Sequence, residues 1–144
     1  MKFFKSKLKY LLLLTLSMAA INFGYAHHSY AMFDMETDLV FSGVVVEYLW
    51  RSPHAHIVIN VEVGEGIDTR TIGTWDIEGA SPAIMTRQGW NRISYQPGDS
   101  IRLVARPMRD GSKGAALFYA IKEDGSCLFM DIARPEDNIL CEGQ

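Results

Sequence analysis

Apolar and polar residues alternate along most of the chain after residue 38, a pattern typical of β-strands with one buried face. The clearest case begins at His54, where every second residue from Ala55 to Val63 is apolar. A bulge is expected at Gly43, inside the first strand. The pattern predicts five strands, at residues 39–50, 54–63, 70–79, 101–106 and 115–122.

One short helix interrupts the strands. Ser81 suits the N-cap, Pro82 the first helical position and Gly89 the C-terminal stop, so a helix is predicted over residues 82–88. Three strands, a helix and two strands follow the order of an OB-type Greek-key barrel. We therefore predict a mainly β fold, a small five-stranded OB-like barrel with one short helix between strands 3 and 4. A small open sandwich is the alternative.

The first 26 residues have the order of a signal peptide. Four lysines and no acidic residue precede an apolar run over residues 11–21, and Gly-Tyr-Ala at 24–26 places small residues where a signal peptidase reads. The run is too short for a membrane span of about 20 residues. We predict cleavage after Ala26, one OB-like domain with a C-terminal tail over 27–144, and a periplasmic or extracellular location. Cleavage after Ala20 and an uncleaved anchor are the alternatives.

Removal of the leader makes the remaining domain acidic. The full chain has 14 Lys and Arg against 17 Asp and Glu, and the leader holds four of the lysines, so ten basic residues remain and the net charge is −7. Nucleic acid and anionic membranes need clustered Lys and Arg, so neither is expected as a partner. No second apolar run approaches the length of a membrane span.

Cys127 and Cys141 are the two cysteines of the chain. An even number of cysteines outside the cytoplasm predicts a disulfide, which would pin the C-terminal tail. A pair of metal thiolates is the alternative, but no histidine lies nearby in the sequence.

The four histidines form two tight pairs, His27 with His28 and His54 with His56. Residues 54 and 56 differ by two and therefore point to the same side of a strand. The apolar residues of this strand occupy the other face, so the second pair is expected to lie opposite the core. These two histidines are then either surface residues or part of a site.

Two carboxylates are expected beside the second histidine pair. If residues 64–68 form a hairpin loop, His56 faces Asp76 and His54 faces Glu78, while Ile57 faces Trp75 in the core. A carboxylate opposite an imidazole can order the ring as an acceptor or act as a ligand itself. A shift of two residues would keep the faces and change these partners.

The first histidine pair depends on cleavage after Ala26, which makes His27 the N-terminal residue. Its amine, with an ordinary pKa near 8, and its ring can chelate a metal together, and His28 adds a second imidazole. Nitrogen-rich sites favour copper over nickel and zinc. A terminus with no metal role is the alternative. We predict a metal site, with copper as the favoured ion. Its predicted ligands are His27, His28, His54 and His56, and the supporting carboxylates are Asp76 and Glu78.

A non-catalytic OB-type binding module for an envelope glycan, peptide or protein is the second hypothesis. Trp50, Trp75 and Trp90 could stack on such a ligand, although core packing is the favoured interpretation. Ser29 and Ser81 lack the setting of a hydrolase nucleophile, and no nucleotide-binding motif occurs. An enzyme is therefore the third hypothesis, and no catalytic residue is assigned.

Several short motifs together resemble a known family. They are Ala26-His27-His28-Ser29, Phe33-Asp34, Ser52-Pro53-His54, residues 75–79 with Ser81-Pro82, Gly89-Trp90 and Pro97-Gly98-Asp99. The chain resembles a family of small secreted bacterial proteins of unknown function that carry His-His-Ser directly after the signal peptide. Where members of the family usually have Asn-Pro-His, this chain has Ser-Pro-His at 52–54. The resemblance implies export and a small β-rich fold and supplies no activity.

Overall fold

The computed structural model describes residues 30–130 and residue 141. The predicted signal peptide and the first histidine pair, His27 and His28, lie outside the described residues. The fold described below belongs to the unit formed by residues 32–144.

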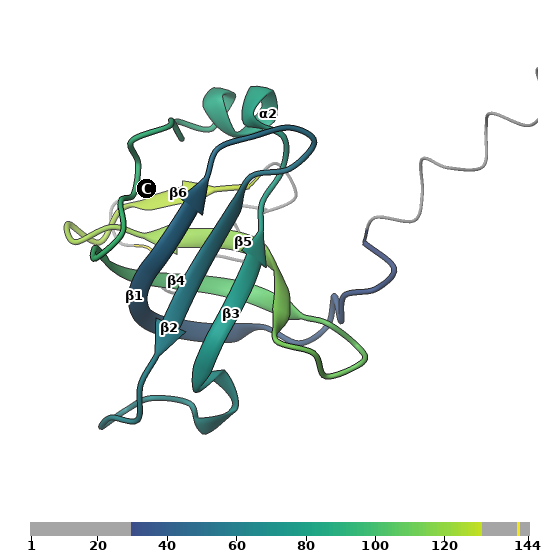
Figure 1. Ribbon diagram of the computed structural model, residues 1–144, viewed down its shortest axis with the longest axis vertical. Helices are drawn as coiled ribbons and strands as arrows, with labels where there is room; N and C mark the ends of the chain where they lie inside the picture. The colour runs from purple at the N-terminus through teal and green to yellow at the C-terminus, as the bar shows by residue number, and fades with distance from the viewer. Residues whose placement is uncertain (1–29, 131–140, 142–144) are drawn as a thin grey trace, which may run out of the picture. The chain divides into compact units, whose positions relative to one another are not determined.

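Strands make up most of the regular secondary structure of the described residues (Figure 1). In chain order the elements are β1 (Leu39–Leu49), β2 (His56–Val61), the 3-10 helix η2 (Thr69–Thr71), β3 (Gly73–Glu78), α2 (Pro82–Arg87), β4 (Ser100–Pro107), β5 (Gly114–Ile121) and β6 (Cys127–Phe129). The sheet order is β3-β2-β1-β4-β5-β6, and β3 also pairs in parallel with β5. This last pairing closes β1 to β5 into a barrel with α2 between β3 and β4. The predicted OB-like barrel is therefore confirmed, and the open sandwich is wrong.

The barrel interior is built from the apolar positions that alternate along the strands. Ile57 and Ile59 of β2 and Trp90 behind α2 are fully buried, and Trp75 of β3 is 5% exposed. The ring of Phe41 meets that of Trp75 edge-on, with centroids 5.0 Å apart. Core packing is thus confirmed for these two tryptophans.

Two details of β1 and β2 differ from the prediction. The bulge in β1 lies between Val45 and Glu47, not at Gly43. Gly43 instead permits a close approach of the neighbouring strand, because a Cβ there would collide with the carbonyl oxygen of Asn60. Strand β2 ends at Val61, so Val63, expected in the core, is 82% exposed.

A second apolar cluster covers the outer face of β4 and β5. It contains buried side chains from both strands and partly buried ones from β6 and the tail: Val104, Phe118, Tyr119, Ile121, Cys127, Phe129 and Cys141. A disulfide joins Cys127 to Cys141, with a Cα–Cα distance of 5.7 Å. The predicted disulfide is confirmed, and the thiolate alternative is wrong. Strand β6, which carries Cys127, was not predicted.

Arg106 also belongs to this covered face. The alternation along β4 predicts a solvated side chain, but it is only 17% exposed. Its Nε donates to Asp38 Oδ1 at 2.8 Å, and its guanidinium lies 4.1 Å from the centroid of the Phe118 ring. The prediction from the alternation is wrong, because the Phe118 ring and the Asp38 carboxylate cover the Arg106 guanidinium.

None of the helices within residues 30–130 is long and apolar enough to cross a membrane.

Candidate functional site: a paired histidine–carboxylate face

His54 and His56 lie at the start of β2 on the outer face of the barrel. The intervening Ala55 and the following Ile57 are buried, while the two histidine side chains are 36% and 26% exposed. Ala55 N–H donates to Ala80 O at 3.0 Å and Ala55 O accepts from Gly79 N–H at 2.8 Å. His54, although it precedes the strand, is therefore held beside the end of β3.

Each histidine contacts a carboxylate of β3. Nδ1 of His56 lies 2.8 Å from Oδ1 of Asp76, and Nδ1 of His54 contacts Oε1 of Glu78. Both carboxylates lie on the outer side of β3, whose inner side carries the buried Trp75. The four side chains thus form two histidine–carboxylate pairs on one open surface.

The backbone register beneath these pairs differs from the prediction by two residues. His56 lies opposite Glu78 rather than Asp76, and Ile57 lies opposite Ile77 rather than Trp75. The predicted hairpin loop over 64–68 is longer in the structure, because η2 replaces the expected start of β3. The expected side-chain contacts still form, because diagonal neighbours on one face are within reach of long side chains.

The contacts with the carboxylates determine which nitrogen of each ring carries the proton. An ionised carboxylate only accepts hydrogen bonds, so Nδ1 of His54 and of His56 carries the proton and donates. In the neutral ring, the lone pair is then on Nε2. A histidine that ligates a metal almost always donates its other ring N–H to a carboxylate, a backbone carbonyl or water. Both histidines show the carboxylate form of this arrangement.

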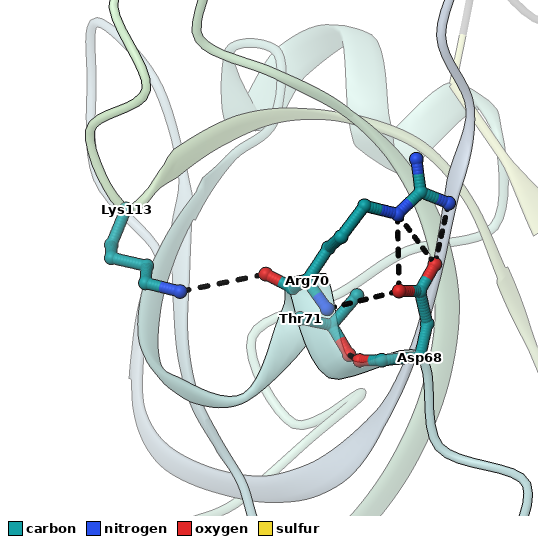
Figure 2. Close-up of polar contacts among 4 residues, drawn as sticks. All are labelled: Asp68, Arg70, Thr71 and Lys113. Atoms are coloured by element: carbon teal, nitrogen blue, oxygen red, sulfur yellow. Dashed lines mark hydrogen bonds and ion pairs between the residues drawn. The ribbon is translucent and has the colours of Figure 1, made fainter.

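The start of β3 is fixed by polar contacts around η2 (Figure 2). Asp68 caps the 3-10 helix by accepting from Arg70 N–H at 2.9 Å, and its carboxylate also pairs with the Arg70 guanidinium. The pKa of the Asp68 carboxyl is held below its ordinary value by these hydrogen bonds from Arg70. Thr71 Oγ1 donates to the Asp68 carbonyl at 2.7 Å.

Lys113, from the β4–β5 loop, ties η2 to the rest of the barrel. Its Nζ donates to Ile72 O at 2.9 Å and to Arg70 O at 3.4 Å, and it lies 4.6 Å from the centroid of the Trp75 ring. The start of the strand that carries Asp76 is thereby held in place. Lys113 was not predicted from the sequence, because its partners are 41 and 43 residues away and no local motif marks them.

The metal site predicted from the sequence is only partly assembled by the described residues. His54, His56, Asp76 and Glu78 are brought to one surface, whereas His27 and His28 lie outside the described residues. Within residues 30–130 and 141, no group of three or more His, Cys, Asp and Glu side chains is placed to hold a metal ion. The described residues alone therefore do not make up a metal site, and metal binding stays a prediction.

The tryptophans do not form an exposed row. Trp90 is buried and its Nε1 donates to Phe129 O at 2.9 Å, and Trp75 is in the core. Trp50 is partly buried beside Tyr48, with ring centroids 5.8 Å apart. A stacking platform made of these three residues is therefore absent from the described surface.

Comparison with known proteins identifies the family. No curated protein and no solved structure matches the sequence. The family model of DUF6152, described as a family of unknown function, matches residues 13–117, which include β1 to β4, α2 and both histidine–carboxylate pairs. The chain belongs to this family of unknown function.

Proposed function

We propose that the protein is a secreted, non-enzymatic metal-binding protein whose site includes Nε2 of His54 and Nε2 of His56. Copper is the favoured ion, with nickel and zinc as weaker candidates, because imidazole nitrogen suits all three and affinity is greatest for copper. The observation that carries the proposal is the carboxylate at Nδ1 of each ring, which supports coordination through Nε2.

The surface around the pairs suits a cation. The outward side chains of β2 and β3 include the carboxylates of Asp76 and Glu78, and within these two strands no Lys or Arg is present to oppose them. The outer face of strands 2 and 3 is also where OB-type barrels usually hold ligands. In this protein the face is acidic, so it favours a positive ion over a negatively charged phosphate backbone.

Two imidazoles are too few for a closed transition-metal site, and we propose that His27 and His28 supply the remaining nitrogens. This part of the proposal rests on the sequence, in which both histidines directly follow the predicted cleavage site.

Cleavage after Ala26 is part of this proposal. It would free the amine of His27, which then chelates together with its own ring. The Cys127–Cys141 disulfide is compatible with the oxidising compartment that such processing implies.

The test is a calorimetric titration of Cu(II) into three forms of the processed protein. The parent should bind one ion, the His54→Ala/His56→Ala variant should bind much more weakly, and one extra N-terminal residue should weaken binding by blocking the amine. Thr74→Ala, an exposed change on the same face, is the matched control. Negligible heats in the parent would overturn the proposal, and so would equal affinities for the parent and the double variant.

A further inference from the structure

A groove crosses the barrel on a different side from the histidine pairs. One hollow, of about 670 Å³, lies between the α2–β4 loop and the end of β5, and it is lined by Tyr95, Asp99 and Lys122 among others. A second, of about 680 Å³, continues from it over β1 and β4 past Ser42 and Arg102. The two hollows share four lining residues, Ser100, Ile121, Lys122 and Glu123. They therefore form one elongated groove.

The walls of the groove come from segments that are far apart in the sequence. Figure 1 shows the chain descending from α2 along one side of the barrel towards β4, with the β5–β6 turn on that same side. Residues of this loop and of the turn line the first hollow together. Each hollow is within the range of about 300–1,000 Å³ that ligand sites occupy.

The charges in the groove exclude a polyanion. Arg102 and Lys122 are opposed by three carboxylates, those of Asp99, Glu123 and Asp124. A phosphate or sulfate polymer needs an excess of Lys and Arg, which this lining lacks. Because the charges of the lining nearly cancel, the expected ligand is neutral overall.

A peptide also fits the groove poorly. Peptides that add to a sheet need an unpaired strand edge, but β1 is paired with β2 and β4, and β4 with β1 and β5. Apolar side chains of a peptide need apolar pockets, and the only bulky aliphatic side chains in the lining of these two hollows are those of Ile101, Ile121 and Leu128, of which the first two are buried.

We propose that this groove binds a neutral oligosaccharide. Its lining offers hydroxyl, amide, carboxylate and cationic groups, which together donate to and accept from sugar hydroxyls. The side chains concerned are Ser42, Asn91, Ser94, Ser100, Arg102, Lys122 and Glu123. The site goes beyond the proposed metal binding and shares no residue with it.

Tyr95 is the aromatic residue that lines the groove. Its ring packs against Tyr48 and Trp90, at centroid distances of 6.4 and 6.1 Å, so its position beside the groove is fixed. Burial raises the pKa of the Tyr95 hydroxyl, and the nearby Asp99 carboxylate adds to the rise. The hydroxyl therefore remains protonated and able to donate at physiological pH.

The test is an NMR titration of the isotopically labelled protein with four neutral tetrasaccharides, namely cellotetraose, maltotetraose, xylotetraose and tetra-N-acetylchitotetraose. At least one should shift the amide signals of residues 94–100 and 121–124 at millimolar concentration. Ser100→Trp, which fills the groove from an exposed position, should weaken that binding at least about tenfold, a loss of about 1.4 kcal/mol. Glu65→Trp, in the exposed β2–β3 loop, is the control and should leave it unchanged.

Three outcomes would overturn the inference. They are no shift with any of the four sugars, shifts confined to residues outside the groove, and equal binding by the parent and Ser100→Trp. Copper binding should be the same in the parent and in Ser100→Trp, so failure of the sugar site leaves the metal site untouched.

Discussion

The two outer faces of the barrel are built from the same alternating strands but are used in opposite ways. On β4 and β5, outward residues such as Val104 and Phe118 are as buried as the interior. On β2 and β3, the outward residues other than Val58 are polar, and the histidine–carboxylate pairs stay open to solvent. One face is closed by β6 and the disulfide, and the other is left uncovered.

This difference separates stability from binding. Burial of the outer face of β4 and β5 adds to the apolar surface that folding removes from water. The interior of a small barrel alone would bury less. The face of β2 and β3 contributes little burial on its outside, so polar residues there cost little stability and remain available for a ligand. Changes on the covered face should therefore affect folding, and changes on the open face should affect binding.

The largest expected effect is on the covered face. Phe118→Ala removes a ring that is 1% exposed and uncovers Arg106, so it should lower the free energy of unfolding by about 3–5 kcal/mol. Denaturant unfolding measures the loss. Thr74→Ala on the open face is the comparison and should change stability by only about 0.5 kcal/mol or less. A similar loss for both variants would contradict the distinction between the faces.

Removal of the disulfide should have the next largest effect. Cys127 and Cys141 are 14 residues apart, and a loop of this size is worth about 3 kcal/mol in the chain-entropy account. The Cys127→Ser/Cys141→Ser variant should unfold at a correspondingly lower denaturant concentration. Its copper affinity, measured on the folded protein, should equal that of the parent. A large loss of copper affinity in the folded variant would show that the two faces are coupled.

The carboxylates should matter for affinity more than for folding. Asp76→Asn and Glu78→Gln keep the size of each side chain but remove the charge that holds Nδ1–H, and loss of such a partner typically weakens metal binding about 10- to 100-fold. Calorimetric titration with Cu(II) measures this. Unfolding curves of both variants should stay close to that of the parent. Unchanged affinity in both would contradict the assigned role of the carboxylates.

The smallest effect is expected in the loop that precedes β3. The pKa of Asp68 is lowered from its ordinary value of 3.8 by hydrogen bonds from Arg70, so its carboxylate contributes stability above that pH and loses the contribution as the pH falls through the folded-state value. Asp68→Asn should be slightly less stable than the parent at neutral pH. The difference in urea unfolding should shrink in strong acid. A difference that stays constant with pH would exclude the charge as its cause.

The sequence predicted the barrel because its strands alternate cleanly and its turns are marked by Gly, Pro and Asp. The short strand β6 was missed, since Cys127 to Phe129 are too few residues to show a period, and so was η2, which follows an ordinary turn sequence. The histidine–carboxylate contacts were expected from a register that was wrong by two residues. They form because a two-residue shift preserves the face of every side chain.

The groove could not be predicted from the sequence, because its lining comes from three separate stretches of the chain that only the closed barrel brings together. Lys113 was missed for the same reason. The covering of β4 and β5 was also beyond the sequence, since the cluster that buries Val104 and Phe118 includes β6, whose three residues are too few to show a period.

The most direct test of the central claim is a long-range ¹H–¹⁵N NMR spectrum of the histidine rings at mildly alkaline pH, with and without Zn(II) as a diamagnetic substitute for copper. Without metal, His54 and His56 should both show the tautomer with the proton on Nδ1. Addition of Zn(II) should shift Nε2 of both rings and leave Nδ1 protonated. A tautomer with the proton on Nε2 in the metal-free protein would contradict a metal site on this face. Ring signals that do not change when Zn(II) is added would contradict it as well.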